Sequence, residues 1–344
     1  MMQRAVAGII GSGAMQTESD LIRILSDGRF HSGEELGQLL GLTRAAVWKR
    51  LRLIRETFGL QVDAVKGRGY RFREPLDLLD ENQIRQHIAD AGCETQGRLY
   101  LHASIDSTNS WLMAQGAAGE PSGTVCLAEQ QMSGRGRHGR QWISPYGRNI
   151  YLSLLWRFEL APMQVAGLSL AAAVGVLRTL HEFDCHGAGL KWPNDILWQE
   201  KKLAGLLLEV SGEAGGPSQV VIGVGLNTWL GDAGDAIDQP WIDLNSIPNV
   251  ARHTRSQLAA SLIGHLLEVI RVYQREGLAA FADDWRRHDL LLDRVVEIRS
   301  ANQRYFGRHL GIDASGALRL LIDGEVRLFH AGEVSLRAGG DASI

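Results

Sequence analysis

A nine-residue segment, Gly134–Trp142, constrains the fold of this chain more than any other part of it. It alternates glycine with arginine, and apolar runs typical of β-strands flank it on both sides. Glycine lets backbone N–H groups approach a ligand closely, and arginine adds a fixed cationic fork suited to carboxylate or phosphate. The pattern predicts a short ordered loop between strands that clamps a small, strongly anionic ligand. The alternatives are an arginine-rich surface loop or an RNA-binding arginine–glycine segment, a class that is usually long, repetitive and disordered.

Length and charge distribution predict two or three domains, one of them basic. The chain has 344 residues, of which 45% are hydrophobic and 22% charged, as in an ordinary soluble globular protein. Residues 17–73 carry eleven Lys/Arg against seven Asp/Glu, a net charge of +4, and the whole chain carries −3, which leaves −7 for the rest. This imbalance indicates a small basic module on an acidic body.

Cysteine usage and hydropathy predict a cytoplasmic protein without membrane contact. The three cysteines show neither C-x-x-C pairing nor metal-ligand spacing, so buried or idle thiols in a reducing compartment are expected. No apolar run reaches the roughly 18–20 residues of a membrane span, and the apolar start at 5–10 is short for a signal peptide. We expect residues 1–16 to be a disordered tail, or translation to begin at Met15.

The N-terminal pattern predicts a helix-turn-helix. Apolar residues indicate helices at about 21–25, 33–40 and 44–56, and Ser32 and Thr43 are suited to cap the second and third. Residues 60–72 then read as a β-hairpin whose basic turn lies near 66–69. A hairpin at this position makes a winged helix-turn-helix.

Basic side chains on this module favour DNA as its partner. In the third helix, Val47, Leu51 and Ile54 repeat at core spacing, so most of its basic residues lie off the buried stripe. A basic helix can enter the major groove and a basic wing can contact phosphates. The candidate DNA-binding residues are Ser32, Thr43, Arg44, Trp48, Lys49, Arg52, Lys66 and Arg68. A trihelical protein-docking module is the alternative.

The central region predicts an α+β or α/β domain with a mixed sheet. After a linker near Glu74-Pro75, a helix is expected at 81–91 and a long apolar helix at 163–183. Strands are expected at 124–130, 150–156, 190–192, 206–210 and 220–225. In the C-terminal region, apolar and polar residues alternate at 295–299, 305–308, 318–322 and 325–329, and turn-forming residues lie between these segments. This pattern predicts short strands.

Further clusters in the central region could carry chemistry. Asp106-Ser-Thr-Asn109 offers short hydrogen-bonding side chains at a strand-to-helix junction, although ordinary capping explains such residues equally well. Lys191-Trp-Pro-Asn-Asp195 places a cation and a carboxylate around a proline turn, and Lys202 leads into an apolar strand. Gly223-Val-Gly-Leu-Asn227 ends a strand, and a plain bulge would also account for it. The sequence shows no nucleophile triad, zinc spacing or P-loop.

Taken in order, these clusters resemble those of biotin–protein ligases, and with the helix-turn-helix the chain resembles the bifunctional BirA type, which is also the biotin operon repressor. The resemblance covers about 18–338. It implies an α+β fold with a winged helix-turn-helix at 17–78 and a class II synthetase-like mixed-sheet ligase domain at 79–287. An SH3-like barrel at 288–338 would follow, and residues 1–16 and 339–344 would be tails.

The resemblance also implies a mechanism. Biotin's carboxylate would attack the α-phosphate of ATP, with Mg²⁺, to give biotinyl-5′-AMP and pyrophosphate. A lysine of the acetyl-CoA carboxylase carrier protein would then take the biotin and release AMP, so no enzyme nucleophile is needed. Biotinyl-5′-AMP would also act as co-repressor, promoting a homodimer that binds operator DNA.

Site residues follow from the resemblance, position by position. The biotin site would comprise Ser107, Thr108, Asn109, Gln131, Gly134, Arg135, Gly136, Arg137 and Lys202. The ATP and adenylate site would comprise Arg137, Arg140, Trp142, Lys191, Asn194, Asp195, Leu226 and Asn227. The residues expected to be catalytic are Lys191, Arg137 and Lys202, and Asp195 is the candidate for placing a metal. His138 and Gln141 depart from the family pattern, where arginine and lysine occur.

Three other readings remain open from sequence. A lipoate–protein ligase would share the central fold but would lack the winged helix and the 134–137 spacing. A ligand-sensing repressor could have lost its ligase activity, although the retained Lys191, Lys202 and Arg137 argue against such decay. Conversely, a ligase could carry a vestigial DNA module.

Overall fold

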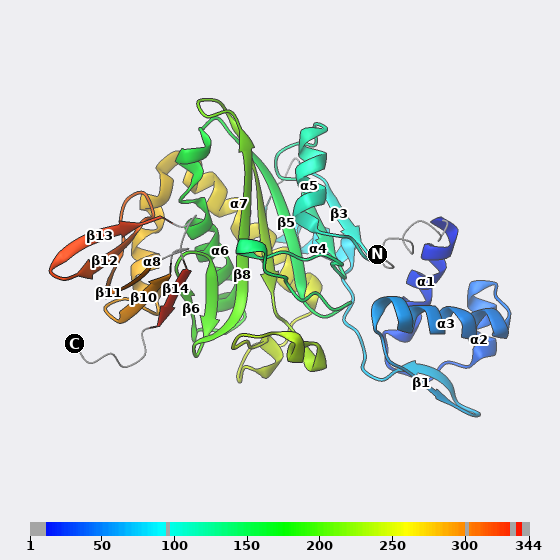
Figure 1. The fold of residues 1–344 in the computed structure, drawn as a ribbon. Coiled ribbons are helices and arrows are strands. Elements are labelled where there is room, and N and C mark those ends of the chain that lie inside the picture. The colour runs from blue at the N-terminus through cyan, green and yellow to red at the C-terminus, as the bar shows by residue number, and fades with distance from the viewer. Residues whose placement is uncertain (1–11, 94–96, 300–302, 331–334, 339–344) are drawn as a thin grey trace.

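The computed structural model describes residues 12–93, 97–299, 303–330 and 335–338 as three parts in a row. In Figure 1 the N-terminal helices lie at one end of a large central sheet domain, and a smaller sheet lies at the other end. Of the two predicted tails, the first lies outside the described residues over 1–11 and the second over its whole length, 339–344.

The N-terminal part has the predicted winged helix-turn-helix elements. These are α1 (Ser12–Leu25), α2 (Gly33–Leu40), α3 (Arg44–Phe58) and the antiparallel hairpin of β1 (Val62–Val65) and β2 (Gly69–Phe72). Helix α1 begins at Ser12, so the expectation of a disordered tail to residue 16 is wrong for its last five residues.

Side-chain caps fix where the helices of this part begin. The Ser32 hydroxyl accepts from the Glu35 backbone N–H while the Glu35 carboxylate accepts from the Ser32 N–H, which is a complete capping box. Thr43 caps α3 by accepting from the Ala46 N–H at 3.2 Å. Because both caps are local, the sequence alone predicts them.

His31 makes the N-terminal part sensitive to pH. Its ring nitrogens lie 3.1 Å from a Glu35 oxygen and 3.2 Å from both Asp27 oxygens. Burial by itself lowers the pKa of His31, but hydrogen bonds to Glu35 and Asp27 outweigh burial and raise the pKa above its ordinary value of 6.5.

We therefore expect the winged helix to lose stability as pH rises. The contribution of His31 is complete below its unfolded pKa and is lost as pH rises through the higher folded pKa. The loss should be small, because solvent screens the half-exposed carboxylates. Thermal unfolding between pH 5.5 and 8.5 measures it, and His31→Asn should remove this part of the slope. An unchanged slope in that variant would refute the assignment.

The winged helix packs on the central part through its linker. Leu76 of the linker and Tyr146 of the central part belong to the hydrophobic cluster of the N-terminal helices, and the ring of Tyr146 lies 4.8 Å from that of Phe58. Glu74 also forms an ion pair with Arg148. The two parts therefore share a core in addition to a covalent connection.

The central sheet has seven strands and is mixed, as predicted. Its order is β3-β4-β5-β9-β8-β7-β6, and every neighbouring pair is antiparallel except the parallel pair β3–β4. The strands are β3 (Leu99–His102), β4 (Val125–Ala128), β5 (Ile150–Phe158), β6 (Ala188–Lys191), β7 (Asp195–Trp198), β8 (Lys201–Gly212) and β9 (Ser218–Leu226).

The sequence did not predict strand β7. The pattern at 191–195 predicts a proline turn after a strand, whereas these residues close a tight β6–β7 hairpin in which Lys191 pairs with Asp195 around the cis Trp192–Pro193 peptide. Strand β8 already begins at Lys201, so Lys202 is part of the strand and does not precede it. Pairing with β6 and β8 makes this short segment a strand, and such pairing is invisible locally.

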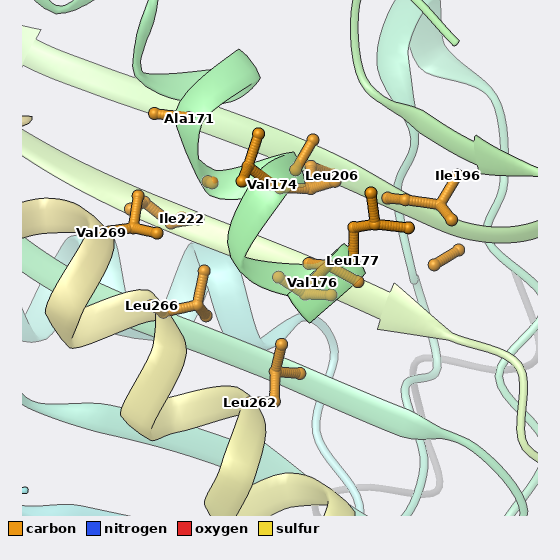
Figure 2. Packing of buried hydrophobic residues seen from close by; sticks show 14 of the residues in the cluster. Ala171, Val174, Val176, Leu177, Ile196, Leu206, Ile222, Leu262, Leu266 and Val269 are labelled. Atoms are coloured by element: carbon orange, nitrogen blue, oxygen red, sulfur yellow. The ribbon is translucent and has the colours of Figure 1, made fainter. Parts of the chain in front are cut away.

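Helices cover both faces of the central sheet. Helix α6 (Leu168–Glu182) packs between the strands and α7 (Arg255–Glu276): in Figure 2 its Val174 and Leu177 lie near Leu206 and Ile196 of the sheet, and Leu262, Leu266 and Val269 come from α7. Helix α4 (Glu81–Asp90) packs on α7. Helix α5 (Thr108–Ala117) packs on β5 and β9 around a separate small cluster with Leu112, Leu155 and Val221.

The long apolar helix expected at 163–183 is divided in two. A 3₁₀ turn at Pro162–Val165 precedes α6, which begins after Gly167. The segment Pro162–Glu182 is long and apolar enough to cross a membrane by length and composition, but 72% of its most apolar window is buried inside the protein. That burial identifies α6 as a core helix.

The C-terminal part follows a short helix, α8 (Ala282–His288), and is a five-stranded antiparallel sheet in the order β13-β12-β11-β10-β14. Its strands are β10 (Val295–Arg299), β11 (Arg304–Ile312), β12 (Leu318–Ile322), β13 (Glu325–Phe329) and β14 (Ser335–Ala338). Four were predicted and β14 was not. Val296, Ile298, Leu318 and Leu320 join the main core, so this sheet packs against the central part.

Candidate functional site

A cavity of about 790 Å³ lies between the 134–142 loop, strands β8 and β9, and the β6–β7 hairpin. This volume is within the range of small-molecule sites. Predicted site residues from six separate segments line it: Ser107, Thr108, Asn109, Gln131, Arg135, Gly136, Arg137, Arg140, Trp142, Lys191, Asn194, Asp195, Lys202 and Asn227. Folding therefore brings the clusters of the sequence into one cavity.

One end of the cavity is neutral and densely hydrogen-bonded. The Gln131 side-chain oxygen accepts from both the backbone N–H and the hydroxyl of Thr108, at 2.9 and 3.1 Å. Asn109 donates to the carbonyl of Leu207 at 3.1 Å. Ser107 caps α5 and also lines the cavity, so its capping role does not exclude the predicted role in binding. These contacts fix the side chains for a neutral polar ligand group.

A buried serine behind the neutral end of the cavity was not predicted from the sequence. Ser153 of β5 is fully buried and donates toward the Thr108 hydroxyl at 2.8 Å and toward Asn109 Oδ1 at 2.6 Å. Nothing in the alternation of that strand distinguishes it from its neighbours. Only the packing of α5 over β5 shows its role.

The other end of the cavity concentrates cations. Lys202 Nζ lies 2.7 Å from Asp195 Oδ1 and 5.4 Å from the centre of the Trp142 ring. Arg137 donates to Asn194 Oδ1 at 3.2 Å. Burial lowers the pKa of Arg137 below its ordinary value, and Arg140 acts in the same direction against the opposing effect of Asp195. Positive charge held out of water in this way favours an anionic ligand.

The glycine–arginine loop is an ordered hairpin. Trp142 N–H donates to Gly134 O at 2.9 Å and Gly136 N–H donates to Arg140 O at 2.7 Å, around a 3₁₀ turn at Arg137–Gly139. A Cβ on Gly134 would lie 2.6 Å from Trp142 O, whereas a Cβ on Gly136 would make ordinary van der Waals contact with Arg140, 3.6 Å from its carbonyl oxygen. Close backbone packing therefore requires glycine at 134, whereas at 136, which lines the cavity, space alone does not.

Two residues of this loop, Arg135 and His138, affect its charge. Arg135 reaches out of it to bind Ser110 at 2.7 Å and Glu209 of β8 at 2.9 Å. His138, which departs from the family pattern, has a pKa lowered by partial burial and by Arg137 and Arg140. His138 is therefore neutral at pH 7.

Two predicted residues do not line the cavity, and two others have their amides engaged. Gly134 closes the loop hairpin, and Leu226 is fully buried in the main core. Asn194 donates to the carbonyl of Leu206 at 2.5 Å, and Asn227 donates to that of Ile242 at 3.2 Å. Asn194 and Asn227 therefore hold backbone in place as well as lining the cavity.

Residues 236–241 form a further wall of the cavity that was not predicted from the sequence. This segment, which includes Pro240 and Trp241, lines the cavity beside Lys202. Lys202 N–H donates to Pro240 O at 2.9 Å, and Ile242 N–H donates to Lys202 O at 3.0 Å. The segment is irregular and carries no periodic signal, so sequence patterns could not place it.

Gly223 provides a test of the neutral end. A Cβ at this position would lie 2.2 Å from Asn109 Oδ1, a buried atom held by Ser153. We expect Gly223→Ala to displace Asn109 and to weaken binding of biotin, the ligand that the resemblance implies, by about 10- to 100-fold, the effect of one disrupted buried hydrogen-bond network. Calorimetric titration measures it, with Gly215→Ala as control because a Cβ there meets nothing within 4 Å. Equal affinities would contradict this geometry.

The candidate DNA-binding face is exposed. Arg44, Trp48, Lys49, Arg52, Lys66 and Arg68 all face solvent. Arg52 lies 3.6 Å from Glu56 and stacks near Trp48, and Arg68 lies 4.2 Å from the Phe30 ring, a contact the sequence did not predict. Ser32 and Thr43 act as helix caps. The α3 face and the wing turn therefore present basic residues to a partner.

The cavity suits a metal held together with a ligand better than a resident metal. Across residues 12–93, 97–299, 303–330 and 335–338, no group of three or more His, Cys, Asp or Glu side chains is placed to hold a metal ion. The carboxylates that line the cavity are Asp195, Glu200 and Asp238. Magnesium commonly binds through one or two carboxylates plus substrate phosphates, so this donor set fits a nucleotide-borne Mg²⁺.

Comparisons with known proteins match all three parts of the chain. Residues 17–71 match an HTH domain, residues 101–227 match the Biotin/lipoate A/B protein ligase family, and residues 291–337 match the Biotin protein ligase C terminal domain. Each match falls on one of the parts described above.

Individual relatives agree with these matches. The bifunctional ligase/repressor BirA of Salmonella typhimurium is 39% identical over 92% of this chain and 97% of its own length. The biotin–[acetyl-CoA-carboxylase] ligase of Mycobacterium tuberculosis is 35% identical over 77% of this chain and 97% of its own. A solved biotin protein ligase from Aquifex aeolicus, in complex with biotin and ATP, superposes with a TM-score of 0.61 at 26% identity, covering 70% of this chain and 99% of that one.

Proposed function

Because this chain belongs to the biotin protein ligase family, of the bifunctional ligase/repressor type, we propose that it activates biotin with ATP and transfers it to a carrier-protein lysine. The observation that carries this proposal is one cavity with two chemically different ends. The neutral end around Gln131 suits the uncharged ureido head of biotin, because a site built on hydrogen bonds rejects analogues that cannot pair. The cationic end around Lys202 suits a carboxylate meeting a triphosphate.

In the first half-reaction the biotin carboxylate oxygen attacks the α-phosphorus of ATP, and pyrophosphate leaves. Two anions must approach each other, so the main task of the protein is electrostatic. Lys202 would leave Asp195 to face the biotin carboxylate and the acyl phosphate. Lys191 and Arg137 would stabilise the charge that develops on the phosphates, and Arg140 and Trp142 would enclose the adenylate side. Magnesium bound with the triphosphate, near Asp195, would neutralise further phosphate charge.

In the second half-reaction an amine of the carrier protein attacks the acyl carbonyl of biotinyl-5′-AMP. An amide bond forms and AMP leaves with the electron pair of the broken acyl–phosphate bond. Lys191 would again stabilise the leaving phosphate. No covalent bond to the protein is required, so the cavity needs only to orient the adenylate and exclude water.

Biotin-dependent ATP–pyrophosphate exchange tests the first half-reaction. Purified protein with ATP, Mg²⁺ and biotin should exchange labelled pyrophosphate and accumulate biotinyl-5′-AMP, and an added biotin carboxyl carrier domain should then become biotinylated on one lysine. Lipoate in place of biotin is the matched control, because the same fold family includes lipoate ligases. Exchange with lipoate and none with biotin would transfer the assignment to that class.

We further propose that the winged helix makes the protein a biotin-responsive repressor in the cytoplasm. The exposed basic face of α3 and the basic wing turn support this role, as does the shared core with Tyr146, which connects the module to the ligase part. Biotinyl-5′-AMP would promote a homodimer that places two winged helices on a palindromic operator.

Footprinting on the biotin genes of the source organism, with and without biotin and ATP, tests this second role. Lys49→Ala should weaken operator binding across sequences and lower the slope of log affinity against log salt by about 1, as loss of one phosphate contact does. Exposed Lys201 in the ligase part supplies the control, Lys201→Ala. Protection that ignores biotin would contradict the co-repressor role, and absence of protection would leave a ligase with a vestigial module.

A further inference from the structure

The outer face of α3 has an apolar centre. Val47, Leu51 and Ile54 are buried, which turns the opposite side of the helix to solvent. On that side Trp48 is 54% exposed, and Ala45, three positions earlier, is exposed too. Residues three apart on a helix are neighbours, so the indole and the alanine methyl group form one apolar patch.

Cations surround this patch. Arg44, Lys49 and Arg52 are exposed on the same helix, each of them four positions from Trp48 or Ala45 and therefore on the same side. The guanidinium carbon of Arg52 lies 5.6 Å from the centre of the Trp48 ring. Covering an exposed indole is favourable, so this face suits a partner that combines negative charge with an accessible apolar group.

Contacts within the module hold this face in place. The Thr43 hydroxyl caps α3. Arg44 and Tyr70 of the wing both pack against Gly33 at the start of α2, where a Cβ would lie 3.1 and 3.3 Å from their side chains. His31 and Tyr70 exchange two backbone hydrogen bonds of 2.8 Å, which join the wing to the segment before α2. The first turns of α3 and the wing are therefore fixed relative to each other.

The major groove of DNA offers this combination of groups. Phosphates border the groove, and the C5-methyl group of thymine is the only methyl group that its base edges present. In a helix-turn-helix the N-terminal residues of the second helix contact base edges, and Trp48 lies in the second turn of α3. Phosphate contacts position a protein, whereas contacts with base edges specify the sequence. The basic rim and the apolar centre of α3 correspond to these two kinds of contact.

We propose that Trp48, with Ala45 beside it, reads thymine methyl groups in the operator, while Arg44, Lys49 and Arg52 hold α3 on the phosphates. The inference rests on the proposed repressor role and adds a sequence preference to it. Each half-site carries thymine where the indole docks, and a half-site without that methyl group binds less tightly.

Replacing thymine by deoxyuridine tests the proposal, because it removes the methyl group and leaves the hydrogen-bonding edge of the base unchanged. The probe is the duplex that the full-length protein protects beside the biotin genes of the source organism, with biotin and ATP present. Each thymine is replaced in turn, together with its counterpart in the other half-site. Fluorescence anisotropy gives the affinities of wild type, Trp48→Ala, Trp48→Phe and Leu39→Ala, the last being a matched control at an exposed apolar residue of α2.

We expect wild type to lose about fourfold in affinity per half-site at one thymine position, the effect of burying one methyl group, and about 10- to 20-fold when both half-sites are changed. Trp48→Ala should bind more weakly and show no further loss at that position. Its slope of log affinity against log salt should match wild type, because no phosphate contact is removed. Trp48→Phe should keep part of the thymine dependence and Leu39→Ala all of it.

Two outcomes would overturn the inference and leave the repressor role intact. One is full wild-type affinity at every deoxyuridine position, and the other is the same thymine dependence in Trp48→Ala as in wild type. Thermal melting checks that Trp48→Ala folds; if it does not, the wild-type series and Trp48→Phe decide in the same way. Absence of any protected duplex would instead refute the repressor role itself, and this inference with it.

Discussion

Lys191→Ala is expected to lower biotin-dependent ATP–pyrophosphate exchange by about 10²- to 10³-fold or more, the usual effect of removing one group that stabilises transition-state charge. Lys191 ends β6 and lines the cationic end of the cavity beside Arg137 and Lys202. Its amine would act only where phosphate charge develops, so kcat should fall much more than the affinity for biotin. Exchange rates under saturating biotin and ATP measure the effect.

The control for this prediction is Lys201→Ala. Lys201 lies on β8 beside Lys202 but is exposed and does not line the cavity. Its loss should leave exchange within about twofold, as for most surface substitutions. Both variants should melt near the wild-type temperature, because neither removes a core side chain. Undiminished exchange in Lys191→Ala would remove this lysine from the mechanism, and Arg137→Ala would then show whether the cationic end participates at all.

Arg255→Leu is expected to destabilise the protein by about 3–5 kcal/mol, the usual cost of breaking a buried ion pair from one side. Arg255 begins α7 with its side chain 4% exposed, and its Nη1 lies 2.6 Å from Oε2 of Glu129. It also donates to the carbonyls of Asp77 and Asn149, at 2.8 and 2.5 Å. The substitution would leave the Glu129 carboxylate buried without a cation. Urea denaturation of the full chain measures the free energy of unfolding.

Arg275→Leu on the same helix is the control, because Arg275 is exposed and, among the residues that the structure describes, forms an ion pair only with its neighbour Glu276; its effect should stay within about 0.5 kcal/mol. The double variant Arg255→Leu/Glu129→Leu should be less destabilised than the two single effects added together, since it removes both charges at once. Additive effects would show that the two side chains stabilise the fold independently.

The ion pair between Arg255 and Glu129 could not be predicted from the sequence. Glu129 was not among the predicted site residues. In the fold the Glu129 carboxylate accepts from the Leu79 N–H at 2.7 Å as well as from Arg255. It therefore binds the segment that follows the winged helix to the end of strand β4. The partners lie 50 and 126 residues away along the chain. No local pattern encodes a contact of that separation.

Features that depend on neighbouring residues were predicted well. The caps at Ser32 and Thr43, the basic hairpin turn and the ordered loop at 134–142 all depend on residues within a few positions of each other, where propensity and hydrogen bonding act directly. The order of the short motifs was enough to indicate the family, because those motifs carry the chemistry. Strand β7 and the start of β8 were not predicted, since their pairing partners decide them.

The sequence by itself thus determined much of the local structure and the family, and it predicted the class of ligand for the loop. Only the tertiary structure decided which residues meet: Lys202 with Asp195, Ser153 behind Asn109, and the 236–241 wall beside Lys202. The physical reason is that these contacts are short-range in space but distant along the chain. Their energies depend on burial and on atomic distances that exist only after the sheet, its helices and the C-terminal strands have packed together.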